Sequence, residues 1–299
     1  MASGNCALST TFAGGGTTLS GEIGKGERMT EWPRTLALAG AGKMGGAMLR
    51  GWLDGGLNAA GVVVVEPHPA PELAALQAER GFALNPPTHA AAEALVLAVK
   101  PQALAEAAPT LQGLAGPQTL VISVVAGKTV ADLAGRFPAA RAFARVMPNT
   151  PAAVGRGASA GAANAAVSAT QRGWTERLMR AVGVFEWVED EALIDAVTAL
   201  SGSGPAYAFA LVEAMAKAGE AVGLPAELAM RLARATVEGA GELMAREPQT
   251  PAAALRQNVT SPGGTTAAAL GVLKAADGLD ALLARAVTAA RDRARELSG

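Results

Sequence analysis

The chain has 299 residues, of which 50 % are apolar and 17 % are charged, so it can bury a sizeable core and wholesale disorder is excluded. Its net charge is −1 and its pI is about 6.2, which argues against a nucleic-acid-binding domain. The single cysteine, Cys6, excludes an intramolecular disulfide, and with two histidines it is too few for a His/Cys metal cluster, so no metal is expected.

Glycine is in excess: the chain has 36 glycines, about 12 % where about 7 % is usual, while aromatic residues make up only 4 %. Small residues must therefore build much of the core, with backbones packed closely together. Two charge-free stretches, 107–127 and 196–212, are interrupted by proline or by glycine–serine pairs, so neither is expected to span a membrane. We expect a soluble, cytoplasmic protein.

The first 34 residues are rich in glycine, serine and threonine and show no hydrophobic period. They lack the positive start and the apolar stretch of a secretory signal. We therefore predict that residues 1–34 are a disordered tail, or a leader that precedes a true start at Met29. Cys6 lies in this segment.

The next part of the chain alternates short apolar runs with helical segments, which is typical of a parallel sheet covered on both faces. We predict a doubly wound α/β domain over residues 35–190, in which ligands bind at the carboxyl ends of the strands. Distinctive loops follow the runs, with the sequences GAGKMG, EPHP, VKP, VAG and MPNTP. The predicted strands are 36–39, 62–65, 95–99, 119–125 and 142–147, and the predicted helices include 47–53 and 71–80.

Beyond residue 190 the spacing of apolar residues is helical and no strand pattern remains. We predict an all-helical domain over residues 191–299, with helices at 195–201, 206–222, 226–246, 266–275 and 279–297. A helical core of this size is modest on its own, so packing against a second subunit is expected.

The pattern Gly40-x-Gly42-x-x-Gly45 follows a predicted strand and opens a predicted helix, which is the context that favours dinucleotide binding. Gly40 permits the tight turn, Gly42 lets backbone approach a pyrophosphate, and Gly45 lets the helix pack closely on the strand. Lys43 and Met44 complete the turn as further cofactor-binding candidates. The alternative is a tight strand-to-helix turn that binds nothing.

Other strand ends carry further cofactor-binding candidates. Glu66 can accept hydrogen bonds from both ribose hydroxyls of NAD and would repel the 2′-phosphate of NADP, whereas His68 could pair with that phosphate. Asn149 offers a donor and an acceptor to a flat amide such as nicotinamide. Prolines in the VKP and MPNTP loops remove backbone hydrogen-bond donors and fix the shape of each loop. The remaining candidates in those loops are Ala98, Val99, Lys100, Pro101, Met147, Pro148 and Thr150; Glu66 and Lys100 could equally be solvated surface charges.

Two segments of the helical domain are unusual. Residues 201–207, with the sequence SGSGPAY, are expected to form a turn between helices. Residues 261–266, with the sequence SPGGTT, precede a helix and offer N–H groups and hydroxyls that suit a small carboxylate. The alternative there is an ordinary helix start capped by Thr265.

No histidine, cysteine or carboxylate pair stands out as a strong general base. Alcohol dehydrogenases need such a base, but reduction of an imine needs less, because a protonated C=N bond is already electrophilic and the cofactor supplies the hydride.

Together these motifs resemble the Δ1-pyrroline-5-carboxylate reductase family. The resemblance runs from about Leu36 to the C-terminal helix and rests on GAGKMG, AVKP at 98–101, RVMPNTP at 145–151, SGSGPAY at 201–207 and SPGGTT at 261–266. It implies reduction of 1-pyrroline-5-carboxylate to L-proline by NADPH or NADH, with a Rossmann-type domain followed by a helical dimerisation domain.

The resemblance also implies roles for residues. The SPGGTT turn would hold the substrate carboxylate, and Thr266 would be the catalytic residue beside the ring nitrogen. The AVKP and MPNTP loops would line the nicotinamide. Helical domains of this family interlock as a homodimer, dimers form rings of five in many members, and the site lies between two subunits. The substrate-binding candidates are therefore Ser261, Gly263, Gly264, Thr265 and Thr266.

The chain departs from the family pattern at two places. Arg256-Gln257 stand where many members have Lys-Asp, and Glu66-Pro67-His68-Pro69 stand where many have serine or threonine for the 2′-phosphate of NADPH. Two other functions stay open: a related imine or 2-hydroxy-acid reductase, with Lys217 as its acid/base, and a silent dinucleotide sensor.

Overall fold

The computed structural model describes residues 31–87 and 90–298. Residues 1–30 of the predicted tail, which include Cys6 and Met29, lie outside the described residues. Residues 32–34, which we assigned to the tail, pack on the first domain. Arg34 pairs with Glu93 at 3.0 Å, and the guanidinium of Arg177 lies 4.6 Å from the ring centre of Trp32. The packed domain therefore begins before residue 35.

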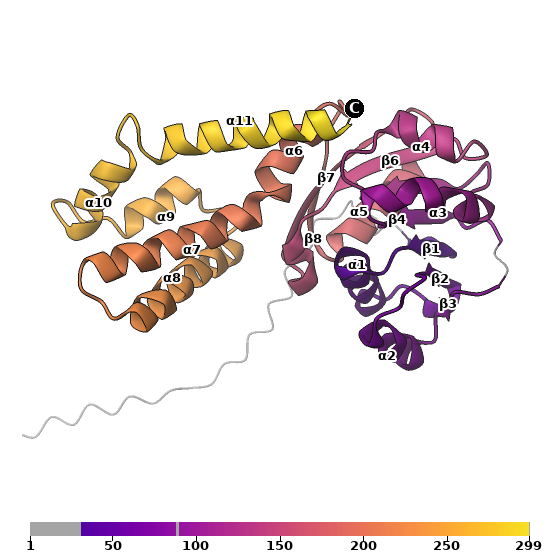
Figure 1. The fold of residues 1–299 in the computed structure, drawn as a ribbon, viewed down its shortest axis with the longest axis horizontal. Coiled ribbons are helices and arrows are strands. Elements are labelled where there is room, and N and C mark those ends of the chain that lie inside the picture. Colours follow the sequence, from indigo (N-terminus) through magenta and orange to yellow (C-terminus); the bar gives the residue numbers. More distant parts are fainter. Residues whose placement is uncertain (1–30, 88–89, 299) are drawn as a thin grey trace, which may run out of the picture.

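The first domain is built on an eight-stranded sheet with the order β3-β2-β1-β4-β5-β6-β7-β8 (Figure 1). The strands β1 to β6 are parallel, β7 is antiparallel to β6, and β8 is parallel to β7. Their bounds are β1 Leu36–Ala39, β2 Val62–Val65, β3 Ala83–Leu84, β4 Ala94–Leu97, β5 Leu120–Ser123, β6 Ala142–Met147, β7 Gly157–Ala163 and β8 Gly183–Trp187.

Alternate residues of the central strands face two cores, because successive side chains of a strand point to opposite faces. Leu36 and Leu38 pack under α1, α2 and α5, while Ala37 and Ala39 pack under α3 and α4. The indole N–H of the fully buried Trp52, on α1, donates to the Leu178 carbonyl at 2.8 Å. The helices are α1 Lys43–Asp54, α2 Pro71–Arg80, α3 Leu104–Leu111, α4 Val130–Arg136 and α5 Ala169–Arg180, with short 3₁₀ turns at Ala59–Gly61, Pro101–Ala103 (η2), Gln112–Leu114 and Thr150–Val154.

The doubly wound α/β architecture is confirmed. Strand order reverses between β1 and β4, which is the point where ligands of such sheets bind. The prediction missed β3, β7 and β8, and it missed α3, α4 and α5. The sequence of β7, GASAGAA, has neither the branched residues nor the alternation that mark a strand.

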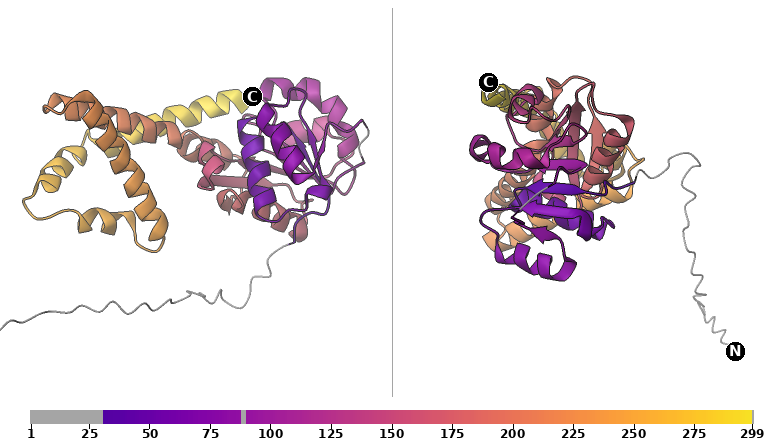
Figure 2. Two further views of the ribbon diagram at one scale, coloured as in Figure 1. Left: turned by 90° about the horizontal axis from the view of Figure 1, so that it is seen from below. Right: turned by 90° about the vertical axis from the view of Figure 1, so that its right-hand side faces the viewer.

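The second half is all helical and extends away from the sheet (Figures 1 and 2). Gly219 on α7 lets α8 approach closely, since a Cβ there would lie 3.1 Å from Ala229 Cβ. The elements are α6 Leu193–Val197, a π-helical turn η5 Thr198–Gly202, α7 Gly204–Ala221, α8 Ala226–Arg246, α9 Ala252–Asn258, α10 Thr265–Leu273 and α11 Leu279–Ser298.

One chain leaves much of this helical half uncovered. Large apolar side chains face solvent on several of its helices, with Phe209 65 % exposed and Val222 84 % exposed. Such an area on several helices indicates an interaction surface. Within the described residues, no helix is both long enough and apolar enough to cross a bilayer. The other exposed large apolar residues of this half are Leu193, Leu200, Leu211, Leu224, Met230, Leu232, Leu243, Met244, Val259, Val272, Leu273, Leu279, Leu282, Leu283 and Leu297.

Candidate active site

The glycine-rich turn after β1 is packed so tightly that two of its positions accept only glycine. Gly40 has a φ of +88°, and a Cβ on it would lie 2.7 Å from the Ala98 carbonyl oxygen. A Cβ on Gly45 would lie 2.0 Å from the Gly40 carbonyl oxygen. The first turn of α1 is therefore held against the ends of β1 and β4 with no room for a side chain.

Gly42 differs from these two glycines, because the protein's own packing does not require it. A Cβ at Gly42 would meet no atom within 4 Å. Gly42 is the N-cap of α1, and no side chain caps this helix start. The first turn is thus uncapped by side chains, and there is open space beside Gly42, where the positive end of the helix favours an anion. This geometry fits the pyrophosphate of a dinucleotide. Lys43 is exposed and Met44 half-buried beside it.

The half-buried Glu66 lies at the end of β2, next to this turn. Its Oε2 accepts a hydrogen bond from the Ala41 N–H at 2.9 Å, and its Oε1 accepts one from the His68 N–H at 3.1 Å. The side chain of His68 is exposed. The structure therefore brings Glu66 and the GAGKMG turn together, as the sequence predicted.

The loop after β4 adjoins the same turn. The Ala98 N–H donates to the Ala39 carbonyl at 2.7 Å, and Ala98 is the residue that Gly40 contacts. Ala98 and Val99 are half-buried, Lys100 is exposed, and Pro101 starts the turn η2. These four candidates therefore share one edge of the sheet with Gly42.

The loop after β6 contacts the helical half. Pro148 and Asn149 are buried and Thr150 is exposed. The Asn149 Nδ2 donates to the Ser201 carbonyl at 3.0 Å, and its Oδ1 accepts from the Ala158 N–H at 2.9 Å. The predicted contact of Asn149 with nicotinamide would therefore have to use its second amide hydrogen or the second lone pair of Oδ1.

The segment 201–207 is not the exposed turn that we expected. It runs from the π-helical turn η5 directly into α7, so the prediction is wrong there. Gly202 faces the loop after β6, since a Cβ on it would lie 2.9 Å from Met147 Cε. Small residues in this segment thus serve close helix-to-loop packing.

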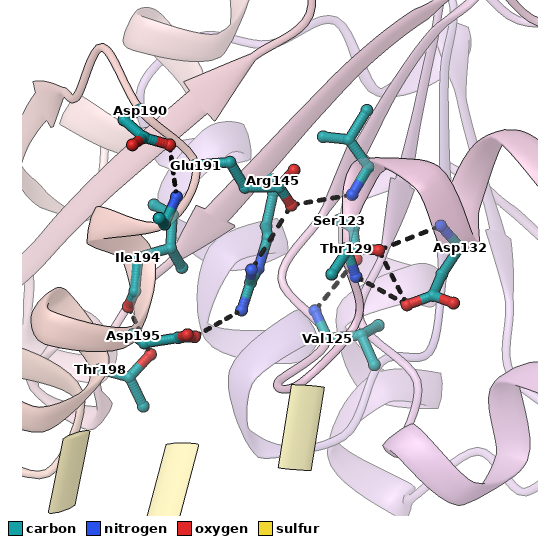
Figure 3. Close-up of polar contacts among 12 residues, drawn as sticks. Ser123, Val125, Thr129, Asp132, Arg145, Asp190, Glu191, Ile194, Asp195 and Thr198 are labelled. Carbon is teal, nitrogen blue, oxygen red and sulfur yellow. Dashed lines mark hydrogen bonds and ion pairs between the residues drawn. The ribbon is translucent and has the colours of Figure 1, made fainter. Parts of the chain in front are cut away.

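A buried ion cluster lies beside this junction and was not predicted. Arg145, on β6, is 5 % exposed and lies between two carboxylates (Figure 3). It pairs with Asp195 of α6 at 3.2 Å and with Glu191 at 3.4 Å. Glu191 also accepts from the Val130 N–H at the start of α4, at 2.8 Å. A lone arginine within the apolar strand AFARVM was the available signal.

The start of α4, in the same view, is closed by a capping box between Thr129 and Asp132. The pKa of the Asp132 carboxyl lies below its usual value, chiefly because the Thr129 N–H donates to it. This helix start is satisfied by side chains, whereas the start of α1 is not.

The SPGGTT turn forms the start of α10. Gly263 has a φ of +68°, and Gly264, not Thr265, is the N-cap, with no side-chain hydrogen bond closing the helix. The alternative of a start capped by Thr265 is therefore wrong. Ser261 and Thr265 are exposed, and Thr266 is half-buried.

Gly42, Glu66 and the Ala98–Pro101 loop share one edge of the sheet, here called the cofactor edge. Within one chain the SPGGTT turn lies far from this edge. The helices α9 and α10 lie at the end of the helical half that points away from the sheet (Figures 1 and 2). One chain does not bring Thr266 to Gly42. Lys217, the alternative acid/base, is exposed on α7. Nowhere in residues 31–87 and 90–298 do three or more His, Cys, Asp or Glu side chains gather as a metal site would require.

Comparison with known proteins assigns both halves. Residues 191–297 match the family described as pyrroline-5-carboxylate reductase dimerisation, and residues 35–127 match the family described as NADP oxidoreductase, coenzyme F420-dependent. A curated pyrroline-5-carboxylate reductase of Pseudomonas aeruginosa is 42 % identical over 268 residues, which cover 88 % of this chain and 96 % of that protein. This chain belongs to the pyrroline-5-carboxylate reductase family.

Other members of the family agree. The pea (Pisum sativum) reductase is 37 % identical over 88 % of this chain and 96 % of its own. The solved reductase of Coxiella burnetii is 36 % identical, with a TM-score of 0.82 over 89 % of this chain and 99 % of that one. The solved Plasmodium falciparum reductase, which has NADP bound, is 26 % identical with a TM-score of 0.69 over 89 % and 98 % of the two chains.

The two kinds of glycine in the GAGKMG turn should separate by experiment. Gly42→Val should leave the melting temperature near that of the wild type, because its Cβ meets no protein atom, but it should lower dinucleotide affinity by about tenfold or more. Gly45→Ala should lower the melting temperature, because its Cβ would overlap the Gly40 carbonyl. Calorimetric titration and thermal melts measure both. Unchanged affinity in Gly42→Val would contradict the assignment.

Arg145→Ala should lower the free energy of unfolding by about 3–5 kcal/mol, because it removes the guanidinium that pairs with the buried Asp195 carboxylate. Arg34→Ala is the control: it removes an arginine that is 89 % exposed, and should change the free energy by less than about 0.5 kcal/mol. Urea unfolding at one fixed protein concentration measures both. Equal effects of the two substitutions would contradict a stabilising role for the cluster.

Proposed function

We propose that this chain reduces 1-pyrroline-5-carboxylate to L-proline with NADH or NADPH, the last step of proline biosynthesis. The observation that carries the proposal is a pair of uncapped helix starts in glycine-rich turns, one before α1 and one before α10. The first suits a pyrophosphate and the second a small carboxylate, and the reaction has one ligand of each kind. Relatives named for this activity align over most of the chain.

The residues of the SPGGTT turn hold the substrate in this proposal. The N–H groups at the start of α10, with Ser261, Gly263, Gly264 and Thr265, bind the carboxylate. The hydroxyl of Thr266 hydrogen-bonds the ring nitrogen and relays a proton to it from water, so the hydroxyl itself is restored. The bound dinucleotide supplies the hydride when it is present. Because a protonated imine is already electrophilic at carbon, the chain needs no strong general base.

The cofactor edge binds and orients the dinucleotide through its own groups. The first turn of α1 holds the pyrophosphate, and Glu66 lies on the ribose side of that turn. The Ala98–Pro101 loop and the Met147–Thr150 loop line the nicotinamide side. Both loops contain prolines, which hold one backbone shape beside the ring.

The complete site forms between two chains. Within one chain α10, which carries Thr266, lies at the outer end of the helical half, away from the sheet, which supports a homodimer in which each site combines the sheet of one subunit with α10 of its partner (Figure 1). The exposed apolar faces of the helical half support the same assembly. We further propose that five dimers form a ring, and light scattering of the purified protein tests this. We also propose that the protein acts in the cytoplasm, as expected from the sequence.

Thr266→Ala should lower kcat by about a hundredfold, because the group that transfers the proton is lost, while dinucleotide affinity stays unchanged. Turnover is followed as loss of nicotinamide absorbance with pyrroline-5-carboxylate. Thr110→Ala, which removes an exposed hydroxyl of α3, is the control. If Lys217→Ala abolished turnover while Thr266→Ala retained it, the related imine or 2-hydroxy-acid reductase would be favoured instead.

A mixture of two impaired variants tests the site between subunits. Gly42→Val damages the cofactor half and Thr266→Ala damages the substrate half, and the rate is measured at a dinucleotide concentration well below the Kd of Gly42→Val. In a hybrid dimer one of the two sites then combines two intact halves, so unfolding and refolding the variants together should restore about a quarter of the wild-type rate. If each site belonged to a single chain, the mixture would show only the average of the two variants' own low rates.

A further inference from the structure

The carboxylate of Glu66 is fixed in place by backbone groups on both sides. Val65, the last residue of β2, pairs with Ala39, the last residue of β1, so Glu66 emerges beside the glycine-rich turn. Each of its two oxygens accepts an N–H hydrogen bond, one from Ala41 and one from His68. The negative charge is thereby held against the turn and does not swing freely into solvent.

Asn85 holds the backbone of Glu66 in the same way. It follows β3 with a φ of 47°, a left-handed conformation that asparagine tolerates better than most residues. Its Oδ1 accepts from the Glu66 N–H and its Nδ2 donates to the Glu66 carbonyl, both at 2.8 Å. Its own N–H donates to the Val64 carbonyl at 2.8 Å. The side chain thus extends the parallel ladder by one residue and fixes where Glu66 leaves the sheet.

The loop after Glu66 offers few groups to a phosphate. Pro67 and Pro69 have no N–H, and the N–H of His68 already donates to Glu66. Residues 66–70 contain no Arg, Lys, Ser or Thr, so the exposed imidazole of His68 is the one cationic candidate among them. The next helix, α2, begins with Pro71 and carries Glu72 in its first turn, which disfavours an anion at its N-terminus.

We propose that this chain selects NAD(H) over NADP(H), that Glu66 sets the selectivity, and that Asn85 is a positioning residue that acts through Glu66. The carboxylate accepts hydrogen bonds from the two ribose hydroxyls and repels a phosphate in place of one of them. The inference rests on the proposed function, which places the adenosine end of the dinucleotide at this edge. The proposed preference for NAD(H) is specific to this chain and is not taken from its family, of which one solved member has NADP bound.

Calorimetric titration of the full chain with NAD⁺ and with NADP⁺, without substrate, tests the proposal. The wild type should bind NAD⁺ about tenfold or more tightly than NADP⁺. Glu66→Ser should weaken NAD⁺ and strengthen NADP⁺, so that the ratio of the two affinities falls by about tenfold or more. Glu79→Ser removes an equal charge from the far end of α2 and should leave the ratio unchanged.

Asn85→Gly tests the positioning role. Glycine adopts a φ of 47° without strain, so the substitution removes the clamp and spares the backbone turn. The ratio of NAD⁺ to NADP⁺ affinity should fall towards one. A purely structural residue would instead lower the melting temperature, or weaken both ligands by the same factor.

Three results would overturn parts of the proposal. A wild type that binds NADP⁺ as tightly as NAD⁺ overturns the selectivity, and loss of that NADP⁺ binding in His68→Ala would name His68 as the phosphate partner. An unchanged ratio in Glu66→Ser removes Glu66 as its cause, and an unchanged ratio in Asn85→Gly removes Asn85. Failure of the proposed function looks different: the chain would bind neither dinucleotide, or would bind one and not reduce pyrroline-5-carboxylate.

Discussion

The close approach of α1 to the ends of β1 and β4 is the constraint on which the cofactor edge depends. With Gly45 against the Gly40 carbonyl and Gly40 against Ala98, the helix cannot shift along the sheet. Its first N–H groups therefore stand at a fixed place relative to Glu66 and to the loop after β4. A helix start that is fixed but uncapped differs from the start of α4, where Thr129 and Asp132 satisfy the same backbone groups.

A second set of contacts joins the sheet to the helical half. Arg145, on β6, pairs with Asp195. Asn149, in the loop after β6, donates to the Ser201 carbonyl. The far end of α11 closes the arrangement, since the Leu297 carbonyl oxygen lies 2.7 Å from where a Cβ on Gly127 would be. Because removal of one partner of such a buried pair leaves the other group buried without it, these contacts tie the helical half to the sheet. The loop that carries Asn149 thus contacts both halves of the chain.

The elements that the sequence predicted well are those with a strong period or clear ends. The predicted helices 71–80 and 226–246 have the observed bounds of α2 and α8, and β1 and β2 also match. The strand β7 escaped prediction because alanine and glycine carry little strand preference, and its place depends on pairing with β6. Residues 201–207, which form the end of η5 and the start of α7, were expected to be a turn because glycine, serine and proline are frequent in turns.

The candidate site shows the same division. The GAGKMG and SPGGTT turns could be found because glycine at fixed spacing marks backbone that must approach something closely. Asn85 could not, since its role depends on β3 ending beside Glu66, and β3 itself has two residues. The hydrogen bonds of Asn149 with Ser201 and Ala158 could not be predicted either, because they form only when the folded chain brings these residues together.

The uncovered apolar helices have a consequence for how the protein is made. A newly synthesised chain that has folded its sheet domain still presents Phe209, Val222 and Val272 to water, so its helical half gains most of its burial only on meeting another chain. Folding of the helical half and association are then coupled, so the stability of the protein falls as its concentration falls. Yield on expression and tolerance of destabilising substitutions should both depend on how many copies the cell holds at once.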